Sequence, residues 1–204
     1  MPKRLMTLLG PFIGLIVVVA LFGAIEPAFL STRNMMTVAI QTVIVGLGAI
    51  GMTFVIVSGG IDLSIGSVIA LSSVVTALCA RAGLSPAASV AAGVAAGALC
   101  GALNGWLVTR LNIVPFIVTL GMMGIARGVS KWLSGEQTVT PSPEASEALA
   151  SLATKSATSP GIWITIALAV VMALVLKRTV FGTYTYAVGS NEDTARLCGV
   201  PVER

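Results

Sequence analysis

Six long apolar stretches, separated by short polar segments, form the main pattern of this chain. We predict one helix in each, over residues 5–25, 36–57, 63–80, 87–108, 115–133 and 161–176. A helix needs about 20 apolar residues to cross the hydrocarbon core of a bilayer, and these stretches approach that length. The pattern therefore predicts an all-α membrane protein, a polytopic transmembrane helical bundle with about six spans in this chain.

The first apolar stretch follows Lys3 and Arg4 directly, an arrangement that also occurs in secretory signal peptides. The run continues to Ile25 without a convincing small-x-small cleavage site, so we predict a retained first helix. Basic residues favour the cytoplasmic side of a membrane. Six crossings from a cytoplasmic N-terminus bring the chain back to the cytoplasm at Lys177 and Arg178, where a second basic pair stands.

The composition supports this membrane location. Hydrophobic residues make up 56% of the 204 residues and charged residues only 10%, whereas soluble domains carry about 25% charged residues. The formal net charge is +4, and the basic residues are scattered, which indicates cytoplasmic loops rather than a nucleic-acid surface. We therefore expect membrane lipid, and no nucleic acid, around this chain.

Residues for catalysis or metal binding are scarce. The chain has no histidine, and Cys79, Cys100 and Cys198 follow no ligand or redox spacing, so we expect no metal site. No lysine follows a glycine, so the Gly-Lys-Ser/Thr motif of a phosphate-binding P-loop is absent. A membrane-embedded enzyme would need convergent acid, base or metal groups, and the candidates within spans are only Asp62 and Arg127, near opposite faces. We expect no catalytic residue and no cofactor on this chain.

A short polar break separates the second and third predicted helices. Its residues are Ser58, Gly59, Gly60, Asp62 and Ser64. The glycines can take the left-handed conformation that closes a helix, and Asp62 or Ser64 can accept from the free amides of the next helix. We therefore predict a broken-helix segment over 58–64, at the cytoplasmic end of the helix pair. Asp62 is then either an N-cap at the membrane edge or part of a polar break that lines a path or acts as a hinge.

The fourth predicted helix has a small residue at every fourth position. These residues are Ser89, Gly93, Gly97, Gly101 and Gly105. Residues four apart share one face of a helix, so this face is almost bare backbone, like an extended Gly-xxx-Gly motif. Chance spacing in a helix rich in Gly and Ala is the alternative. Five residues in register favour close packing of the four glycines against another helix.

Three polar residues within predicted spans are candidates for lining a polar path: Asn104, Thr119 and Arg127. Asn104 lies near the inner end of the fourth helix, where it can instead bond to a neighbouring helix or to nearby backbone. A charge such as Arg127 is costly in lipid. Its side chain either extends to the outer headgroups or lines a polar vestibule.

Two polar segments flank the last predicted span. Residues 134–160 contain three glutamates with Ser, Thr and Pro, as expected of an extracytoplasmic loop, and 144–154 can form a short interfacial helix. Residues 177–204 are expected in the cytoplasm. There Ser190 or Asn191 can cap a short helix that Gly199 ends, with acidic residues at its first turn. This helix is either a docking element for a partner or an ordinary connection.

Three blocks of sequence now identify a family. The first covers 51–67, including Ser-Gly-Gly-Ile-Asp-Leu-Ser at 58–64; the second covers 104–105, 114–122 and 126–128; the third covers 182–200. In this order they resemble the permease subunits of ribose-type sugar ABC importers, within the branched-chain amino acid and monosaccharide superfamily. The resemblance covers most of the chain. It makes the break part of a signature but assigns Asp62 no role. Together with the topology count, which places Asp62 on the same side as the docking helix, it favours a hinge or structural break near the coupling face over contact of Asp62 with sugar.

The resemblance implies a single permease domain over 1–204 that translocates a ribose-like monosaccharide across the bacterial cytoplasmic (inner) membrane. Such permeases continue into further transmembrane helices, so this chain resembles a partial permease, truncated at its C-terminus. A nucleoside, a cyclitol or a furanosyl signal molecule is an alternative cargo within the family. A structural or otherwise non-transporting membrane protein is the alternative outside transport.

The resemblance also implies partners. They are a second permease copy in a homo- or heterodimer, ABC ATPase subunits that bind ATP-Mg, and a periplasmic or lipid-anchored sugar-binding protein. The segment that docks on the ATPase corresponds to the helix near 191–199. The coupling residues that it implies are Asn191, Glu192, Thr194, Ala195, Arg196 and Gly199.

Overall fold

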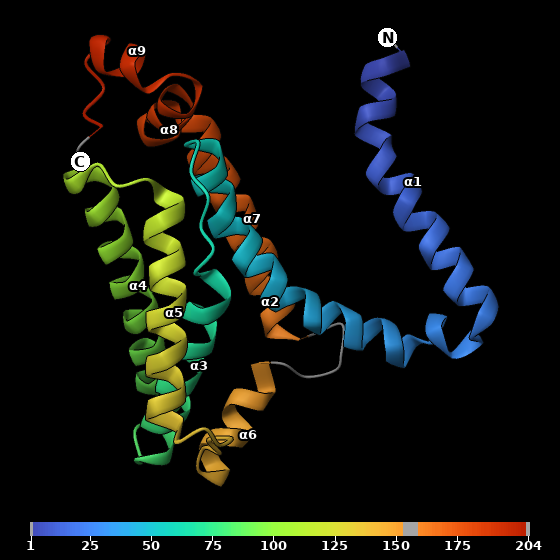
Figure 1. Cartoon of the computed structure of the whole chain (residues 1–204). Coiled ribbons are helices and arrows are strands. Elements are labelled where there is room, and N and C mark those ends of the chain that lie inside the picture. Colours follow the sequence, from blue (N-terminus) through green and yellow to red (C-terminus); the bar gives the residue numbers. More distant parts are fainter. Residues whose placement is uncertain (1, 153–158, 203–204) are drawn as a thin grey trace.

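The computed structural model describes residues 2–152 and 159–202 and is helical throughout its regular structure (Figure 1). The elements are α1 (Pro2–Ile25), the 3-10 helix η1 (Pro27–Leu30), α2 (Thr32–Val57), α3 (Ile65–Arg81), α4 (Pro86–Leu111), α5 (Pro115–Ser134), α6 (Pro143–Leu152), α7 (Pro160–Arg178), α8 (Val180–Ser190) and α9 (Glu192–Leu197).

All six predicted apolar stretches are helical, which confirms the all-α fold class. The second helix begins earlier than expected, because the hydroxyl of Ser31 accepts from the amide of Asn34 and caps α2 there. The interfacial helix within the long polar segment is present as α6; its expected end at Thr154 lies outside the described residues, as do 203–204 of the segment 177–204. Helix α8 was not predicted.

The helices form two packed groups. Helix α3 packs against α4 and α5, and α2 packs against α7, while α8 joins α7, α2 and α9. Helix α1 packs against η1 and runs apart from the bundle in Figure 1. Successive long helices run in opposite directions, so α2 and α4 end, and α5 begins, near α8 and α9 (Figure 1). We call this end of the molecule the α9 end, and the opposite end, where α6 lies, the α6 end.

The packed core is small and lies between α3, α4 and α5. It consists of Leu71, Cys100, Met122 and Ala126, with Val68, Val75 and Leu133 packed around it. In contrast, large apolar side chains face outward along the helices: Ile16 is 65% exposed, Val45 70% and Val94 66%. Such a surface is unfavourable in water and suits lipid or further apolar helices.

Three helices of the described chain, α2, α4 and α7, are long and apolar enough to cross a membrane. Two shorter apolar helical segments, Phe12–Ile25 and Ile65–Arg81, accompany them. These spans and the exposed apolar surface identify a polytopic helical membrane protein.

Candidate functional site: the helix break and the adjoining segment

Helix α2 ends in a Schellman motif at the predicted break. The amide of Gly60 donates to the carbonyl of Val55 (2.8 Å), and the amide of Gly59 donates to the carbonyl of Ile56 (3.0 Å). Gly59 has a φ of 84°, in the left-handed region that favours glycine, whereas Gly60 has no positive φ. Two of the free carbonyls at the end of α2 are thereby satisfied.

Residues 60–64 have no regular secondary structure, so the break is longer than a tight turn. The Oδ1 of Asp62 accepts from the amide of Ser64 (2.7 Å) and from its hydroxyl (2.6 Å). Ser64 occupies the N-cap position of α3, but its φ and ψ are helical and its side chain makes no capping bond. Of the two expected cap residues, Asp62 therefore has a side chain that accepts from a main-chain amide, whereas the side chain of Ser64 accepts from none.

Two polar side chains from other helices hold this break in place. The hydroxyl of Thr119 on α5 donates to the carbonyl of Ile61 (3.2 Å). The Nδ2 of Asn104 on α4 donates to the hydroxyl of Ser64 (3.2 Å), which in turn donates to Asp62. Two of the three pathway candidates thus meet the break, and they bond to it rather than facing an open channel.

The polar pairing around the break is incomplete. The Oγ of Ser67 and the Oδ1 of Asn104 are buried without a hydrogen-bond partner among the described residues. These side chains are only 2% and 7% exposed. Most buried polar groups in folded proteins are paired, so these two atoms mark an unusual place in the bundle.

The break reaches into the bundle from the α9 end. Asn104 lies seven residues before the end of α4 at Leu111, which corresponds to about 10 Å at 1.5 Å per residue. The break thus begins at the end of the helix pair, as predicted, and its last residue lies deeper in the bundle. Residues 60–64, which have no regular secondary structure, cover this distance, and α3 begins after them.

The third pathway candidate, Arg127, lies elsewhere. Its side chain is exposed on α5, two helical turns beyond Thr119 towards the α6 end. The structure therefore does not bring Arg127 together with Asn104 and Thr119.

The glycine face of α4 packs over only half of its length. A Cβ added at Gly93 would overlap the hydroxyl of Thr76 and lie 2.8 Å from the carbonyl oxygen of Ser72, and one at Gly97 would lie 3.0 Å from the hydroxyl of Ser72. Ser89 is fully buried. In contrast, no described residue lies within 4 Å of a Cβ added at Gly101 or Gly105, so the predicted close packing at these two glycines is not seen among residues 2–152 and 159–202.

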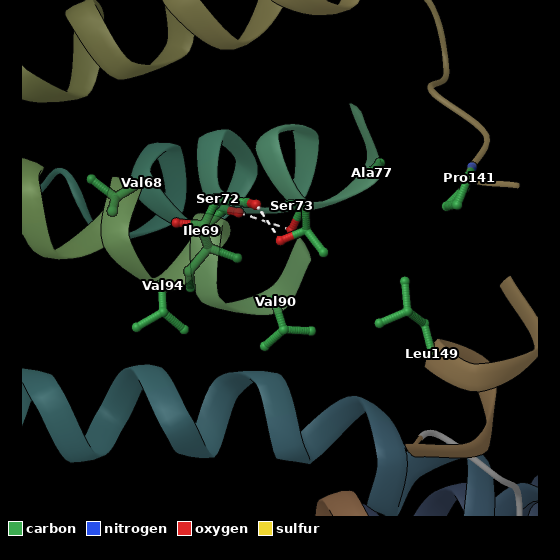
Figure 2. Close-up of a pocket in the computed structure, with 11 residues that line it drawn as sticks. Val68, Ile69, Ser72, Ser73, Ala77, Val90, Val94, Pro141 and Leu149 are labelled. Atoms are coloured by element: carbon green, nitrogen blue, oxygen red, sulfur yellow. Dashed lines mark hydrogen bonds between the residues drawn. The ribbon is translucent and has the colours of Figure 1, made fainter. Parts of the chain in front are cut away.

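A cavity of about 430 Å³ borders the packed half of this face (Figure 2). Helix α3 contributes Ser72, Ser73 and Thr76, and the α6 side contributes Pro141 and Leu149. The hydroxyls of Ser73 and Thr76 donate to the carbonyls of Ile69 (2.9 Å) and Ser72 (2.8 Å) within α3. These hydroxyls are therefore already engaged in their own helix.

The short helix predicted near 191–199 is present as α9, and both of its ends are capped. The Oδ1 of Asn191 accepts from the amide of Thr194 (2.8 Å), as expected of the N-cap. Arg196 forms an ion pair with Glu192 (2.8 Å) one turn earlier. Gly199, with a φ of 82°, ends the helix in a second Schellman motif, in which the amide of Val200 donates to the carbonyl of Ala195 (3.0 Å).

Ala195 is buried, whereas Asn191, Glu192, Thr194, Arg196 and Gly199 are exposed at the α9 end. The exposed residues are therefore accessible to another protein.

Helix α8 connects this segment to the break. A Cβ added at Gly189 would overlap the carbonyl oxygen of Val57, and one at Gly182 would overlap the carbonyl oxygen of Leu176 on α7. The ring of Phe181 also lies against Phe54 of α2, with the centroids 6.0 Å apart. The sequence interpretation missed both glycines, although their seven-residue spacing places them on one helix face.

A cavity of about 870 Å³ lies beside this contact. The break contributes Ser58, Gly59 and Gly60, and the start of α5 contributes Pro115. Helices α8 and α9 form the other side, together with residues 200–202. The break and the coupling segment therefore share one open space at the α9 end.

Comparison with known proteins shows the family of this chain. The sequence model of the branched-chain amino acid transport system permease component matches residues 34–204, which include the break, the glycine face and α9. This chain belongs to that permease family.

Members of the family that resemble this chain include the ribose import permease protein of Bacillus subtilis, 39% identical over 96% of this chain. The L-arabinose transport system permease protein of Escherichia coli is 40% identical over 87% of this chain. An inner membrane ABC transporter permease protein of Escherichia coli is 36% identical over 85%. The chain spans 61%, 54% and 54% of the length of these three relatives, respectively. No solved structure matches it.

Proposed function

We propose that this chain works as the membrane-embedded permease part of an ABC importer that moves a monosaccharide into the cell. The observation that carries the proposal is the position of α9, an exposed and doubly capped helix joined through α8 to a break inside the helical bundle. An ATPase subunit that docks on such a helix can act on the transmembrane part without a catalytic residue in this chain.

The proposed ATPase contact uses the exposed residues of the coupling segment, namely Asn191, Glu192, Thr194 and Arg196. Ala195 and Gly199 shape the segment rather than project from it, because the first is buried and the second ends the helix. ATP-Mg belongs to the ATPase subunits in this proposal, and this chain binds no cofactor of its own.

The proposed cargo is a ribose-like monosaccharide. Relatives named as ribose and L-arabinose permeases support this class. The same architecture can serve a nucleoside, a cyclitol or a furanosyl signal molecule, because a periplasmic or lipid-anchored sugar-binding protein would select the cargo. The exposed apolar helix faces also provide surface for a second permease copy, either identical or different.

The proposed location is the bacterial inner membrane, with the N-terminus and the α9 end in the cytoplasm. Arg110, Lys177 and Arg178 lie in the last turns of α4 and α7, both at the α9 end. Basic residues favour the cytoplasmic side. The acidic residues Glu144 and Glu147 lie on α6 at the other end.

Cysteine cross-linking tests the ATPase contact. In a background without Cys79, Cys100 and Cys198, Thr194→Cys is expected to cross-link to a cysteine-labelled partner ATPase, because Thr194 is exposed on α9. Ala82→Cys, exposed at the α6 end, is the matched control and should give no product.

Uptake of labelled ribose, arabinose, inositol and a nucleoside by cells that also express the ATPase and the binding protein then identifies the cargo. Absence of both the cross-link and any uptake would instead indicate a non-transporting membrane protein.

A further inference from the structure

The contact between α8 and the end of α2 is a contact between main chains. A Cβ on Gly189 would overlap the carbonyl oxygen of Val57 and lie 3.1 Å from the carbonyl carbon of Ser58. From the other side, a Cβ on Gly59 would lie 3.7 Å from the Cα of Gly189. Only glycine at position 189 allows this approach, so the position of α8 is set directly by the first residues of the break.

On the C-terminal side of Gly189, a very short connection joins α8 to the proposed coupling helix α9. The amide of Asn191 donates to the carbonyl of Ala187 on α8 (3.1 Å), and the Oδ1 of the same residue caps α9. Asn191 is the only residue between the two helices. A displacement of α9 is therefore carried to Gly189 through continuous hydrogen bonding.

On the other side of the contact at Gly189 lies the irregular segment between α2 and α3. Residues 60–64 are held by single hydrogen bonds from Thr119 and Asn104. The buried Oγ of Ser67 and Oδ1 of Asn104 beside them have no hydrogen-bond partner in the described part of the chain. Because buried polar groups favour pairing, a shift of this segment that gives them partners would be favourable. The adjoining cavity of about 870 Å³ leaves space for α8 and α9 to move.

We propose that Gly189 is a positioning residue of the transport cycle, through which movement of α9 displaces the break at 58–64. This inference rests on the proposed function, because the force on α9 comes from the docked ATPase. Gly189 contacts no cargo in this scheme. It acts through the main chain of Val57 and Ser58 at the end of α2.

The test is the number of ATP molecules hydrolysed per sugar imported, measured with the whole transporter in proteoliposomes. Gly189→Ala is expected to raise the number of ATP molecules hydrolysed per sugar about tenfold, within the usual range of coupling between sites. Cross-linking of Thr194→Cys to the ATPase should persist, because α9 itself is unchanged.

Gly182→Ala is the matched control. It places an equally severe overlap on the same helix, but against Leu176 of α7 rather than against the break. A structural defect lowers uptake and ATP hydrolysis together, so Gly182→Ala should leave their ratio near the wild-type value. An unchanged ratio for Gly189→Ala, or an equal change for both variants, would overturn the inference.

Hydrogen exchange provides a second readout that does not depend on uptake or on the folded amount. In the wild-type complex, exchange of the amides at 61–64 should change when ATP is added, and in Gly189→Ala this change should be lost. A wild-type break that does not respond to ATP contradicts the inference even if the cross-link forms. If Thr194→Cys gave no cross-link and the wild type gave no uptake, the proposed function itself would be contradicted.

Discussion

Gly189 packs its main chain against the carbonyl oxygen of Val57, at the point where α2 ends and the break begins. The two residues are 132 positions apart (189 − 57) and belong to the coupling segment and to the transmembrane part, respectively. In the proposed transporter, a contact of this kind would connect the ATPase-facing segment rigidly to the membrane-embedded part. Here the connection uses backbone, so its length cannot vary with side-chain rotamers.

The packed half of the glycine face on α4 predicts opposite effects for two glycine substitutions. Gly93→Ala should lower the free energy of unfolding by about 1–3 kcal/mol, because the added methyl group overfills a tight contact. Its neighbours, Thr76 and the main chain of Ser72, are close on α3. Gly101→Ala has free space and should raise helix stability by about 0.5–1 kcal/mol. Thermal unfolding in nanodiscs measures both, and equal effects would contradict the half-packed face.

The hydroxyl of Thr119 predicts a cost that a similar threonine does not share. Thr119→Val removes the donor to the carbonyl of Ile61, and loss of this part-buried hydrogen bond costs about 0.5–1.5 kcal/mol. Thr109→Val is the control, because that hydroxyl donates to Gly105 within its own helix. Denaturant unfolding of the two variants should show a loss for Thr119→Val only. Similar losses would mean that the break does not depend on this bond.

The carboxylate of Asp62 predicts protection of a single amide. Asp62→Asn keeps an acceptor for the amide of Ser64, whereas Asp62→Ala removes it. Hydrogen exchange at Ser64 should therefore be slow in the wild type and in the Asn variant, and clearly faster in the Ala variant. The amide of Gly60, bonded to Val55 in the Schellman motif, serves as the internal reference. Equal exchange at Ser64 in all three proteins would exclude Asp62 as its acceptor.

The distribution of charge predicts the topology. A phosphatase or fluorescent reporter fused after Arg178 should report a cytoplasmic position, and one inserted after Glu136 should report the opposite side. Helix α7 ends at the α9 end of the bundle and α5 ends at the α6 end (Figure 1), so the two reporters would lie at opposite ends. An external signal at Arg178 would overturn the proposed orientation.

The helices could be predicted because apolar length and local capping determine them. The N-cap at Asn191 and the helix end at Gly199 both follow from side chains within a few residues. Helix α8 was missed because its sequence, from Val180 to Ser190, is rich in β-branched and aromatic residues of weak helix propensity. Its stability comes from packing against α7 and α2, which a local pattern does not contain.

The site could be predicted only in part. The residues of the break follow from the Ser-Gly-Gly pattern, but its depth depends on bonds from Thr119 and Asn104, which are 58 and 40 residues away from their partners. The unused half of the glycine face has a similar cause. A repeat of glycines shows where a helix can be approached, whereas the neighbours of Gly101 and Gly105 depend on the arrangement of the other helices.

The main-chain contact at Gly189 also has a consequence for genetics. Every residue at position 57 presents the same carbonyl oxygen, so no replacement of Val57 can make room for a larger residue at 189. Second-site revertants of Gly189→Ala should therefore carry changes that let α8 tilt as a whole. Phe54 and Phe181, whose rings hold α8 against α2, are the expected positions. Sequencing such revertants would identify the residues that fix the position of α8, without any structural measurement.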